Sequence, residues 1–389
     1  MSVLHIPLRY NVRSLSRRWL TTLLTVSGVA LVVATFVALM AMASGLAGAI
    51  AGGADPANVI LLYRGGISEA LSRVTVNQFQ TLRFLPQLAR NARGEPLASL
   101  EALININCER PDGGMTLVLF RGLRPIGFQV HRRVKLKAGR WFTPSSDECV
   151  VGGGLAQRAT GMSMGSRLQV GRRHFLVVGV LEAEGTGFES ELWADLDDVV
   201  GAAQRDWYNS VSVTLREPSE FGAFEAAIRN DPRIELGART EADYYEEQAA
   251  SAEGFRVIGL IVAFFMAVGA ALAEMNTMFA AIASRTREIG TLRALGFRRR
   301  DILTSFLAEA VLLAVPGGML GCLAGSWIDG RSMSVLSMAT LSEVVFRFRV
   351  TPEILALAFA SSLVLGLLGG MLPALQAARL PVLDALRRV

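Results

Sequence analysis

Lysine, histidine and cysteine are scarce in this chain of 389 residues, which contains two lysines, three histidines and three cysteines. Neither Lys135 nor Lys137 follows a G-x-x-x-x-G pattern, so the sequence has no Walker A loop to cradle nucleotide phosphates. The three histidines are scattered and show neither H-E-x-x-H nor Cys/His ligand spacing. We therefore expect no catalytic residue, no metal and no cofactor in this chain.

Charged residues are missing from four long stretches. Residues 19–54, 257–273, 310–328 and 354–378 contain no Asp, Glu, Lys, Arg or His. Because a helix needs roughly 20 apolar residues to cross a bilayer, the sequence predicts four spans, at 19–54 and at about 257–280, 305–328 and 354–377. The first stretch is far longer than the roughly 7 to 15 apolar residues of a secretion signal, so we expect a retained anchor.

Positive charge gathers on one side of these spans. Residues 1–18 hold four Arg and no acid, residues 284–301 six Arg and two acids, and the tail after residue 378 three Arg and one acid. Residues 55–256 balance 23 basic against 26 acidic residues, and residues 329–353 hold three of each. The positive-inside rule therefore places both termini and the central loop in the cytoplasm and the large segment outside. The net charge of +5 suits anionic lipid and a cytoplasmic partner, not nucleic acid.

The first 18 residues have the periodicity of an amphipathic helix. Leu4, Leu8, Val12 and Leu15 share one face, and the arginines of this segment lie on the opposite face. This pattern predicts a helix in the membrane interface, with its apolar face toward the lipid. A plain cytosolic extension of the first span is the alternative.

The external segment alternates short apolar runs with turn signals. We expect strands at residues 115–120, 167–170, 175–181 and 210–215, and helices at residues 77–90, 155–160 and 218–230. The predicted fold class is an α-helical membrane protein with four transmembrane helices and an extracytoplasmic α/β domain between the first two. Cys108 and Cys149 in this domain are expected to be separate thiols, although a disulfide stays open.

Two features of the external segment superficially suggest ligand sites. Seven acidic residues between positions 182 and 198 could bind a cation, but they lack Asp-x-Asp-x-Asp-Gly spacing and are expected to form a solvated loop. The glycines at 152–154 follow a strand-like run, as in a phosphate cradle. They lack the accompanying Lys-Ser/Thr or a complete G-x-G-x-x-G, so this signal is weak.

Several runs closely resemble the FtsX-like permease family. They are NTM at 276–278, RTREIGTLRALG at 285–296, FLAEA at 306–310, GGMLG at 317–321 and PALQAARLPVLDALR at 373–387. Residues 10–15 and 22–25 look like the start of the family's first span. The runs at 138–142, 147–152 and 175–180 resemble the MacB-type periplasmic core domain more loosely.

The resemblance implies a permease subunit of a type VII ABC transporter in the bacterial inner membrane. Such a chain works by mechanotransmission and exports or extracts a lipid, lipoprotein, peptide or drug-like cargo. The implied partners are a cytoplasmic ATPase that holds ATP and Mg²⁺, a second permease copy or homologous permease, and a periplasmic adaptor with an outer-membrane channel. The implied domains are an interfacial helix (1–18), the first span and its extension (19–54), the external domain (55–254) and the permease domain (255–389).

Within the permease domain the resemblance implies a coupling helix at residues 286–297. An apolar ridge and small residues in this segment would allow a partner's backbone to approach closely. The expected ATPase-coupling residues are Arg287, Glu288, Ile289, Gly290, Leu292, Arg293, Ala294, Leu295 and Gly296. A second cytoplasmic contact is expected in the tail at 379–389, from Arg379, Pro381, Ala385, Leu386 and Arg387. The alternative is that the central segment is only a positive-inside loop.

Other permease residues are expected to pack the spans together. They are Asn276, Glu309, Gly317, Gly318 and Gly321, and the glycines form a small-residue face that permits close helix packing, with a dimer seam as one possible place. A carboxylate within a span is costly unless it is paired, so we expect Glu309 to contact Asn276 or Arg285. A proton-relay role for Glu309 is the alternative.

Two further function classes stay open. A regulator of an extracytoplasmic cell-wall hydrolase or sensor would use the same ATPase, although an external domain of about 200 residues favours transport. A membrane-anchored receptor would bind no ATPase.

Overall fold

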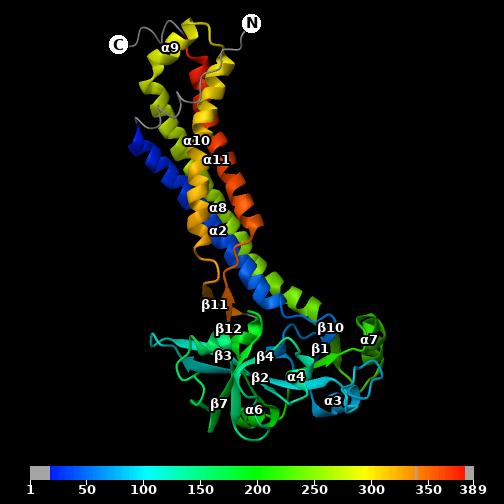
Figure 1. Cartoon of the computed structure of the whole chain (residues 1–389). Helices are drawn as coiled ribbons and strands as arrows, with labels where there is room; N and C mark the ends of the chain where they lie inside the picture. Colours follow the sequence, from blue (N-terminus) through cyan, green and yellow to red (C-terminus); the bar gives the residue numbers. More distant parts are fainter. Residues whose placement is uncertain (1–17, 338–339, 382–389) are drawn as a thin grey trace. The chain divides into compact units, whose positions relative to one another are not determined.

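The computed structural model describes residues 18–337 and 340–381, and its chain forms two compact units (Figure 1). A helical unit contains the residues up to Ser44, Glu253–Arg331 and the residues from Phe348 on. An α/β unit contains Gly45–Ala252 and Ser332–Arg347. The predicted interfacial helix, apart from its last residue Arg18, and the tail residues Ala385, Leu386 and Arg387 lie outside the described residues.

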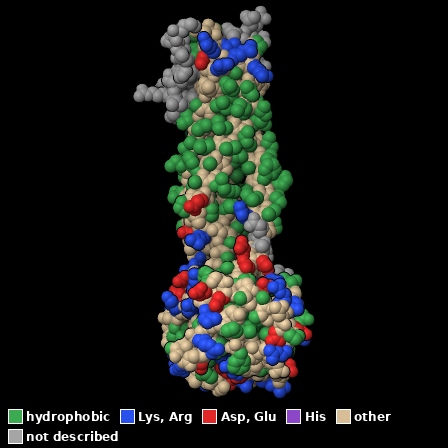
Figure 2. All heavy atoms as spheres, turned by 90° about the vertical axis from the view of Figure 1, so that its right-hand side faces the viewer, with side chains coloured by type: hydrophobic (Ala, Val, Ile, Leu, Met, Phe, Trp, Pro, Cys, Tyr) green, Lys and Arg blue, Asp and Glu red, His purple; other side chains and the backbone are tan. Residues whose placement is uncertain are grey.

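Four described helices are long and apolar enough to cross a membrane, as the missing charges predict. They are α2 (Trp19–Ala51), α8 (Glu241–Ser284, apolar from Arg256 on), α10 (Arg299–Ser326) and α11 (Pro352–Arg379). At the start of α11, Thr351 caps the helix by accepting a hydrogen bond from the Ile354 N–H. Hydrophobic side chains cover the surface of these helices in Figure 2, whereas both charge signs mix on the α/β unit.

Glycines let α10 approach its neighbours closely. A Cβ atom added at Gly321 would lie 2.5 Å from Cβ of Val33 on α2 and 2.7 Å from the Ala30 carbonyl oxygen. Gly317 meets α2 in the same way, and Gly318 meets α11. The predicted small-residue face therefore packs inside one chain, where these glycines are buried.

The α/β unit is built on a sheet with the strand order β10-β1-β9-β2-β3-β8-β5-β7-β4, and β6 pairs with β7. These strands are β1 (Asn58–Tyr63), β2 (Ala98–Glu109), β3 (Met115–Leu123), β4 (Lys135–Gly139), β5 (Glu148–Gly152), β6 (Arg167–Val170), β7 (Arg173–Glu182), β8 (Glu191–Asp195), β9 (Ser210–Thr214) and β10 (Leu236–Thr240). The long strand β2 pairs with β9 through its first four residues and with β3 through the remainder.

Short helices cover this sheet. They are η1 (Glu69–Leu71), α3 (Val76–Leu82), α4 (Gly127–Val130), α5 (Gly153–Ala156), η2 (Gly187–Ser190), α6 (Leu196–Ala203), η3 (Pro218–Glu220) and α7 (Phe221–Asn230). The four predicted strands and the helix at 218–230 are confirmed. The helix predicted at 77–90 stops at Leu82, and at 155–160 the structure has only the end of the four-residue α5. Apolar periodicity over so few residues does not distinguish a helix from a packed loop.

The segment between α10 and α11 is a β-hairpin that belongs to the α/β unit. Its strands are β11 (Ser332–Ser337) and β12 (Ser342–Arg347). The Val345 N–H donates to Ser190 Oγ at 2.7 Å, and Asn105 Nδ2 donates to the Thr340 carbonyl at 3.1 Å. The sequence indicated only a charge-balanced external loop here.

The acidic run at 182–198 is largely buried, so the expectation of a solvated loop was wrong. Its buried members are Glu189, Glu191, Asp195 and Asp198, each at most 6% exposed. Asp198 binds Arg173 at 2.8 Å, and Glu189 accepts hydrogen bonds from the N–H groups of Ala183 and Gly185. Charge alone suggested a surface loop, but η2, β8 and α6 place these residues in the interior. No group of three His, Cys, Asp or Glu among the described residues is placed to hold a metal ion.

The glycine run at 152–154 serves packing. A Cβ atom at Gly152 would overlap the carbonyl group of Glu189, so only glycine fits between β5 and η2. The helix that follows has only four residues, too few for a phosphate site at its N-terminus. Cys108 and Cys149 are buried, separate thiols, and burial raises their pKa values to about 11 and about 12.

A buried arginine joins several elements of the sheet. The Arg121 guanidinium on β3 donates to Glu101 on β2 at 2.6 Å, to Glu191 on β8 at 2.8 and 2.9 Å, and to Glu69 on η1 at 3.3 and 3.4 Å. Arg121 is 2% exposed, and the three carboxylates are at most 6% exposed. A charge so buried must be paired, and this pairing fixes three elements to β3.

A histidine completes this network. His131, at the end of α4, lies 2.7 Å from Glu101 through its Nε2 atom. Burial alone would raise the pKa of Glu101, but the charges and hydrogen bonds of His131 and Arg121 outweigh it and lower that pKa to about 2. Burial would lower the pKa of His131, but Glu101, helped by Glu241, raises it.

We expect Gly321→Ala to destabilise the helical unit by about 1–3 kcal/mol, because the new methyl group overlaps Val33 and the α2 backbone. Thermal unfolding of the full chain in detergent measures the change. Gly28→Ala is the matched control, since a Cβ atom at Gly28 meets nothing within 4 Å. An equal loss in both variants would contradict the proposed packing.

The α/β unit should lose stability at both ends of the pH range. The contribution of Glu101 is present above its unfolded pKa of about 4.5 and is lost as the pH falls toward 2, on the order of 3 kcal/mol. The contribution of His131 is complete below pH 6.5 and is lost as the pH rises through its raised folded pKa. Denaturant unfolding monitored by tryptophan fluorescence tests this, and His131→Gln should abolish the loss at high pH and reduce the loss at low pH, because His131 also lowers the pKa of Glu101.

Candidate functional site

The helix α9 (Thr286–Ala294) connects α8 to α10 and is the part of the predicted coupling segment that is helical. It ends in a Schellman motif, in which the Gly296 N–H donates to the Arg293 carbonyl and the Phe297 N–H donates to the Leu292 carbonyl. Gly296 has φ +100°, a conformation that strongly favours glycine. The sequence suggested that Gly296 admits a partner's backbone, but its conformation shows that it terminates the helix.

An ion pair fastens α9 to α10. Arg285, which precedes α9, donates from Nη1 to Glu309 of α10 at 3.2 Å and from Nε to Glu288 of α9 at 3.2 Å. Its guanidinium also lies 5.8 Å from the ring centre of Phe306. Glu309 is 3% exposed, so this carboxylate has the paired setting that a charge within a helix bundle requires. Of the two partners expected for Glu309, the structure brings Arg285 to it.

One face of α9 packs against its own helix bundle. Its apolar core joins α8, α9, α10 and α11 and contains Met278, Ile282, Ile289, Ile302, Phe306, Ala310, Ala374, Ala377 and Ala378. Ile289 is 3% exposed, Gly290 is also buried, and Leu292 packs partly against the same core. Ile289 and Gly290, which the sequence assigned to the ATPase contact, are therefore buried in this chain's own bundle, because the i, i+3 apolar spacing marks the inner face of the helix.

The opposite face of α9 is open. Its exposed residues are Arg287, Glu288, Thr291, Ala294, Leu295 and Gly296. Leu295 is 69% exposed, the one large apolar side chain of this face. Figure 2 shows positively charged side chains gathered at the α9 end of the helical unit, and these are arginines because both lysines lie in the α/β unit. This face therefore presents an exposed leucine among small and charged residues.

Other predicted positions are divided between the surface and the interior. Asn276 is exposed and makes no hydrogen bond to a described residue, so the structure does not support its expected packing role. Arg293 is half-buried, and its Nη1 donates to the Phe297 carbonyl at 3.4 Å, within the chain. Arg379 ends α11 and Pro381 follows it, and both are exposed.

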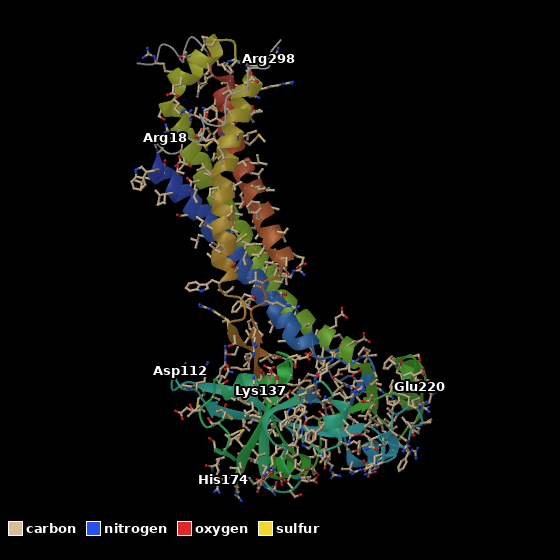
Figure 3. All side chains as sticks on the ribbon, in the orientation of Figure 1. Arg18, Asp112, Lys137, His174, Glu220 and Arg298 are labelled. Atoms are coloured by element: carbon tan, nitrogen blue, oxygen red, sulfur yellow. The ribbon has the colours of Figure 1, made fainter. Side chains whose placement is uncertain are left out.

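The start of α2 lies beside this region. Arg18 donates from Nη2 to the carbonyl of Ala281, near the end of α8, at 3.2 Å. Figure 3 shows Arg298, just before α10, at the α9 end of the unit. Arg18 and Arg298, two of the arginines that served to orient the chain, thus lie at the α9 end of the helical unit. Sequence reasoning missed the contribution of Phe306 and Met278, whose apolar character alone did not set them apart from other span residues.

Comparison with known proteins agrees with this architecture. Residues 22–231 match the MacB-like periplasmic core domain, and residues 260–382 match the FtsX-like permease C-terminal family. The structure and these families thus share four apolar helices, and a MacB-like α/β domain follows the first helix.

The relatives are larger proteins. The macrolide export ATP-binding/permease protein MacB of Chlorobium phaeobacteroides is 26% identical over 399 residues, which cover 94% of this chain and 58% of that protein. The pyoverdine export ATP-binding/permease protein PvdT of Pseudomonas entomophila is 31% identical over 239 residues, 57% of this chain and 35% of that protein. The matches therefore span less than two thirds of either relative.

A solved structure is also similar. The periplasmic region of MacB from Actinobacillus actinomycetemcomitans is 11% identical and covers 50% of this chain and 94% of that chain, with a TM-score of 0.38.

We expect Glu309→Gln to destabilise the helical unit by about 3 kcal/mol, because Arg285 then keeps a buried charge with a weaker partner. Thermal unfolding of the purified chain in detergent measures the loss. Arg287→Gln, on the exposed face of α9, is the control and should change stability by no more than about 0.5 kcal/mol.

The double variant Arg285→Met with Glu309→Leu should recover most of this loss, because it removes both buried charges. If the loss of stability in the double variant equals the sum of the losses in Arg285→Met and Glu309→Leu, the ion pair is not the link between α9 and α10. Unchanged stability and assembly in Glu309→Gln would do so as well.

Proposed function

We propose that this chain, which belongs to the FtsX-like permeases that carry a MacB-like periplasmic core domain, is the permease component of an ATP-driven ABC exporter. The names of its relatives couple an ATP-binding part with a permease part. The observation that supports the proposal is α9, whose inner face is fastened to the bundle and whose outer face presents Leu295.

The coupling step is a push on α9. An ABC ATPase that closes on ATP and Mg²⁺ displaces the outer face of α9 in the cytoplasm. The ion pair between Arg285 and Glu309 passes this displacement to α10, which packs closely against α2 and α11. Both α2 and α8 are continuous helices that contain residues of the helical unit and of the α/β unit. Motion of the spans is thus conveyed to the periplasmic side along unbroken backbone.

The remaining parts of the proposal concern location and assembly. The chain resides in a bacterial inner membrane with its termini in the cytoplasm, as a dimer with a second permease copy. Its cargo is a lipid, lipoprotein, peptide or drug-like molecule, received from the periplasmic side and passed to an adaptor and an outer-membrane channel. The charge-balanced surface of the α/β unit is consistent with a solvated periplasmic domain (Figure 2).

Replacing Leu295 by Asp should remove the ATPase. The variant introduces a charge at the exposed apolar contact without disturbing the core, whereas Leu292 is half-buried and would confound the test. We expect ATPase activity that co-purifies with the chain from native membranes to fall at least about tenfold, since one buried charge at an interface costs several kcal/mol.

Leu341→Asp is the matched control. Leu341 is an exposed residue of the β11–β12 turn with φ +52°, a conformation that Asp tolerates better than leucine. This variant should retain the co-purified ATPase. If no ATPase accompanies the unaltered chain, or if Leu295→Asp retains it, the proposal fails.

A further inference from the structure

The membrane-spanning part of α8 buries one acidic residue, Glu274. It is the only Asp, Glu, Lys, Arg or His between Arg256 and Arg285, and it is 1% exposed, less than any apolar residue buried there. Only 11% of the most apolar 18-residue stretch of this span is buried inside the chain, against 28–44% in the other three spans. The span that its neighbours cover least therefore places a carboxyl group at its most buried side chain.

Within the described part of the chain, this carboxyl group has no partner. Neither Oε1 nor Oε2 of Glu274 makes a hydrogen bond to a described residue, and both atoms are buried. Thr277, on the next turn of α8, donates to the backbone carbonyl of Glu274 at 2.7 Å and not to its side chain. Glu309 on α10 is different, because Arg285 binds it at 3.2 Å.

A glycine on α11 makes room for the carboxyl group. A Cβ atom added at Gly369 would lie 3.0 Å from Glu274 Oε2, 3.1 Å from Glu274 Cβ and 3.1 Å from the Ala271 carbonyl oxygen. The next residue, Gly370, faces α10 instead, where an added Cβ atom would meet Cβ of Ala310 at 2.5 Å. Helix α11 therefore lies between α8 and α10, and Glu274 is part of its contact with α8.

No charged group among the described residues compensates Glu274, because none forms an ion pair or another electrostatic contact with it. Helix α2 has no acidic or basic residue, and those of α11 are Glu353 and Arg379 at its two ends. Beyond its first turn, α10 has Glu309 alone, and Arg285 balances that charge. An ionised Glu274 would be an isolated charge in this packing.

The position of Glu274 along α8 makes such a charge unfavourable. Eleven residues, or about 16 Å of helix, separate it from Arg285, so it lies at the depth of the hydrocarbon core. An unpaired carboxylate is strongly disfavoured at this depth, whereas a neutral carboxylic acid loses much less hydration on burial. The packed arrangement of α8 and α11 therefore requires Glu274 in its neutral form.

We propose that Glu274 is a proton-dependent lock between α8 and α11. With a proton bound, the neutral side chain lies against Gly369 and the two helices stay packed. When the proton passes to water, the remaining charge no longer fits this contact. The two helices then separate at this level until water reaches the carboxylate. This inference does not depend on the ATPase contact or on export.

Infrared spectroscopy of the full chain in nanodiscs tests the bound proton. A neutral carboxyl group has a C=O band that is separate from the bands of a carboxylate. At neutral pH, the spectrum of the unaltered chain minus that of Glu274→Gln should contain this band. Glu182→Gln, at an exposed carboxylate of the α/β unit that lies 3.5 Å from Lys137, is the matched control and should give no such band. Absence of the band from the Glu274 difference spectrum would overturn the proposal.

Hydrogen exchange tests the movement of the helices. Backbone amides of α8 and α11 near Glu274 and Gly369 are compared at neutral pH and at about pH 9, where a buried carboxyl group ionises, after correction for the intrinsic exchange rate. Protection in the unaltered chain should fall at least about fivefold at the higher pH. Glu274→Gln cannot ionise and should keep its protection. An equal response of both chains, or no response in the unaltered chain, contradicts the lock.

Glu274→Leu distinguishes the lock from an ordinary structural contact. This variant replaces an unpaired buried acid by an apolar side chain of similar size, so thermal unfolding in detergent should show unchanged or raised stability. Its hydrogen exchange should also lose the response to pH. A large loss of stability in Glu274→Leu would show that the carboxyl group makes a required contact, and the proposal would then be wrong. If Glu274→Gln does not fold, Glu274→Leu replaces it in both comparisons.

Discussion

A buried arginine must be paired with carboxylates, and the two compact units of this protein depend on that requirement. Arg121 gathers carboxylates from η1, β2 and β8 onto β3, and Arg285 joins α9 to α10 through Glu309. Removing one member of such a group leaves an uncompensated charge, which makes these contacts more costly to break than surface ion pairs. Each group therefore fixes the geometry of the elements around it.

The two arginines differ in the groups that surround them. Arg121 uses all its donors inside the α/β unit, where carboxylates from three elements surround it. Arg285 uses its guanidinium to attach α9 to α10, and the other face of α9 is exposed. The same chemistry thus joins strands in the interior of one unit and attaches a helix to its bundle in the other.

Local and compositional features of the chain were predictable, and tertiary pairings were not. Missing charge located the four spans, and apolar alternation located β3, β6, β7 and β9. The acidic run at 182–198 was misassigned because a buried carboxylate and a solvated one look alike in sequence until the partner is known. The same limit applies to Ile289, since an apolar ridge on α9 could equally meet the bundle or a partner. The position of Glu309 within an apolar stretch was the one clue that demanded a partner.

The strand β2 belongs to both halves of the sheet, since it pairs with β9 at its beginning and with β3 over its remaining length. Two lobes joined only by side chains could slide or hinge against each other. Here a force applied to the half with β1, β9 and β10 is transmitted to the other half through the covalent backbone of β2. The α/β unit is therefore expected to turn as a stiff body, with its compliance confined to the chain segments that leave it.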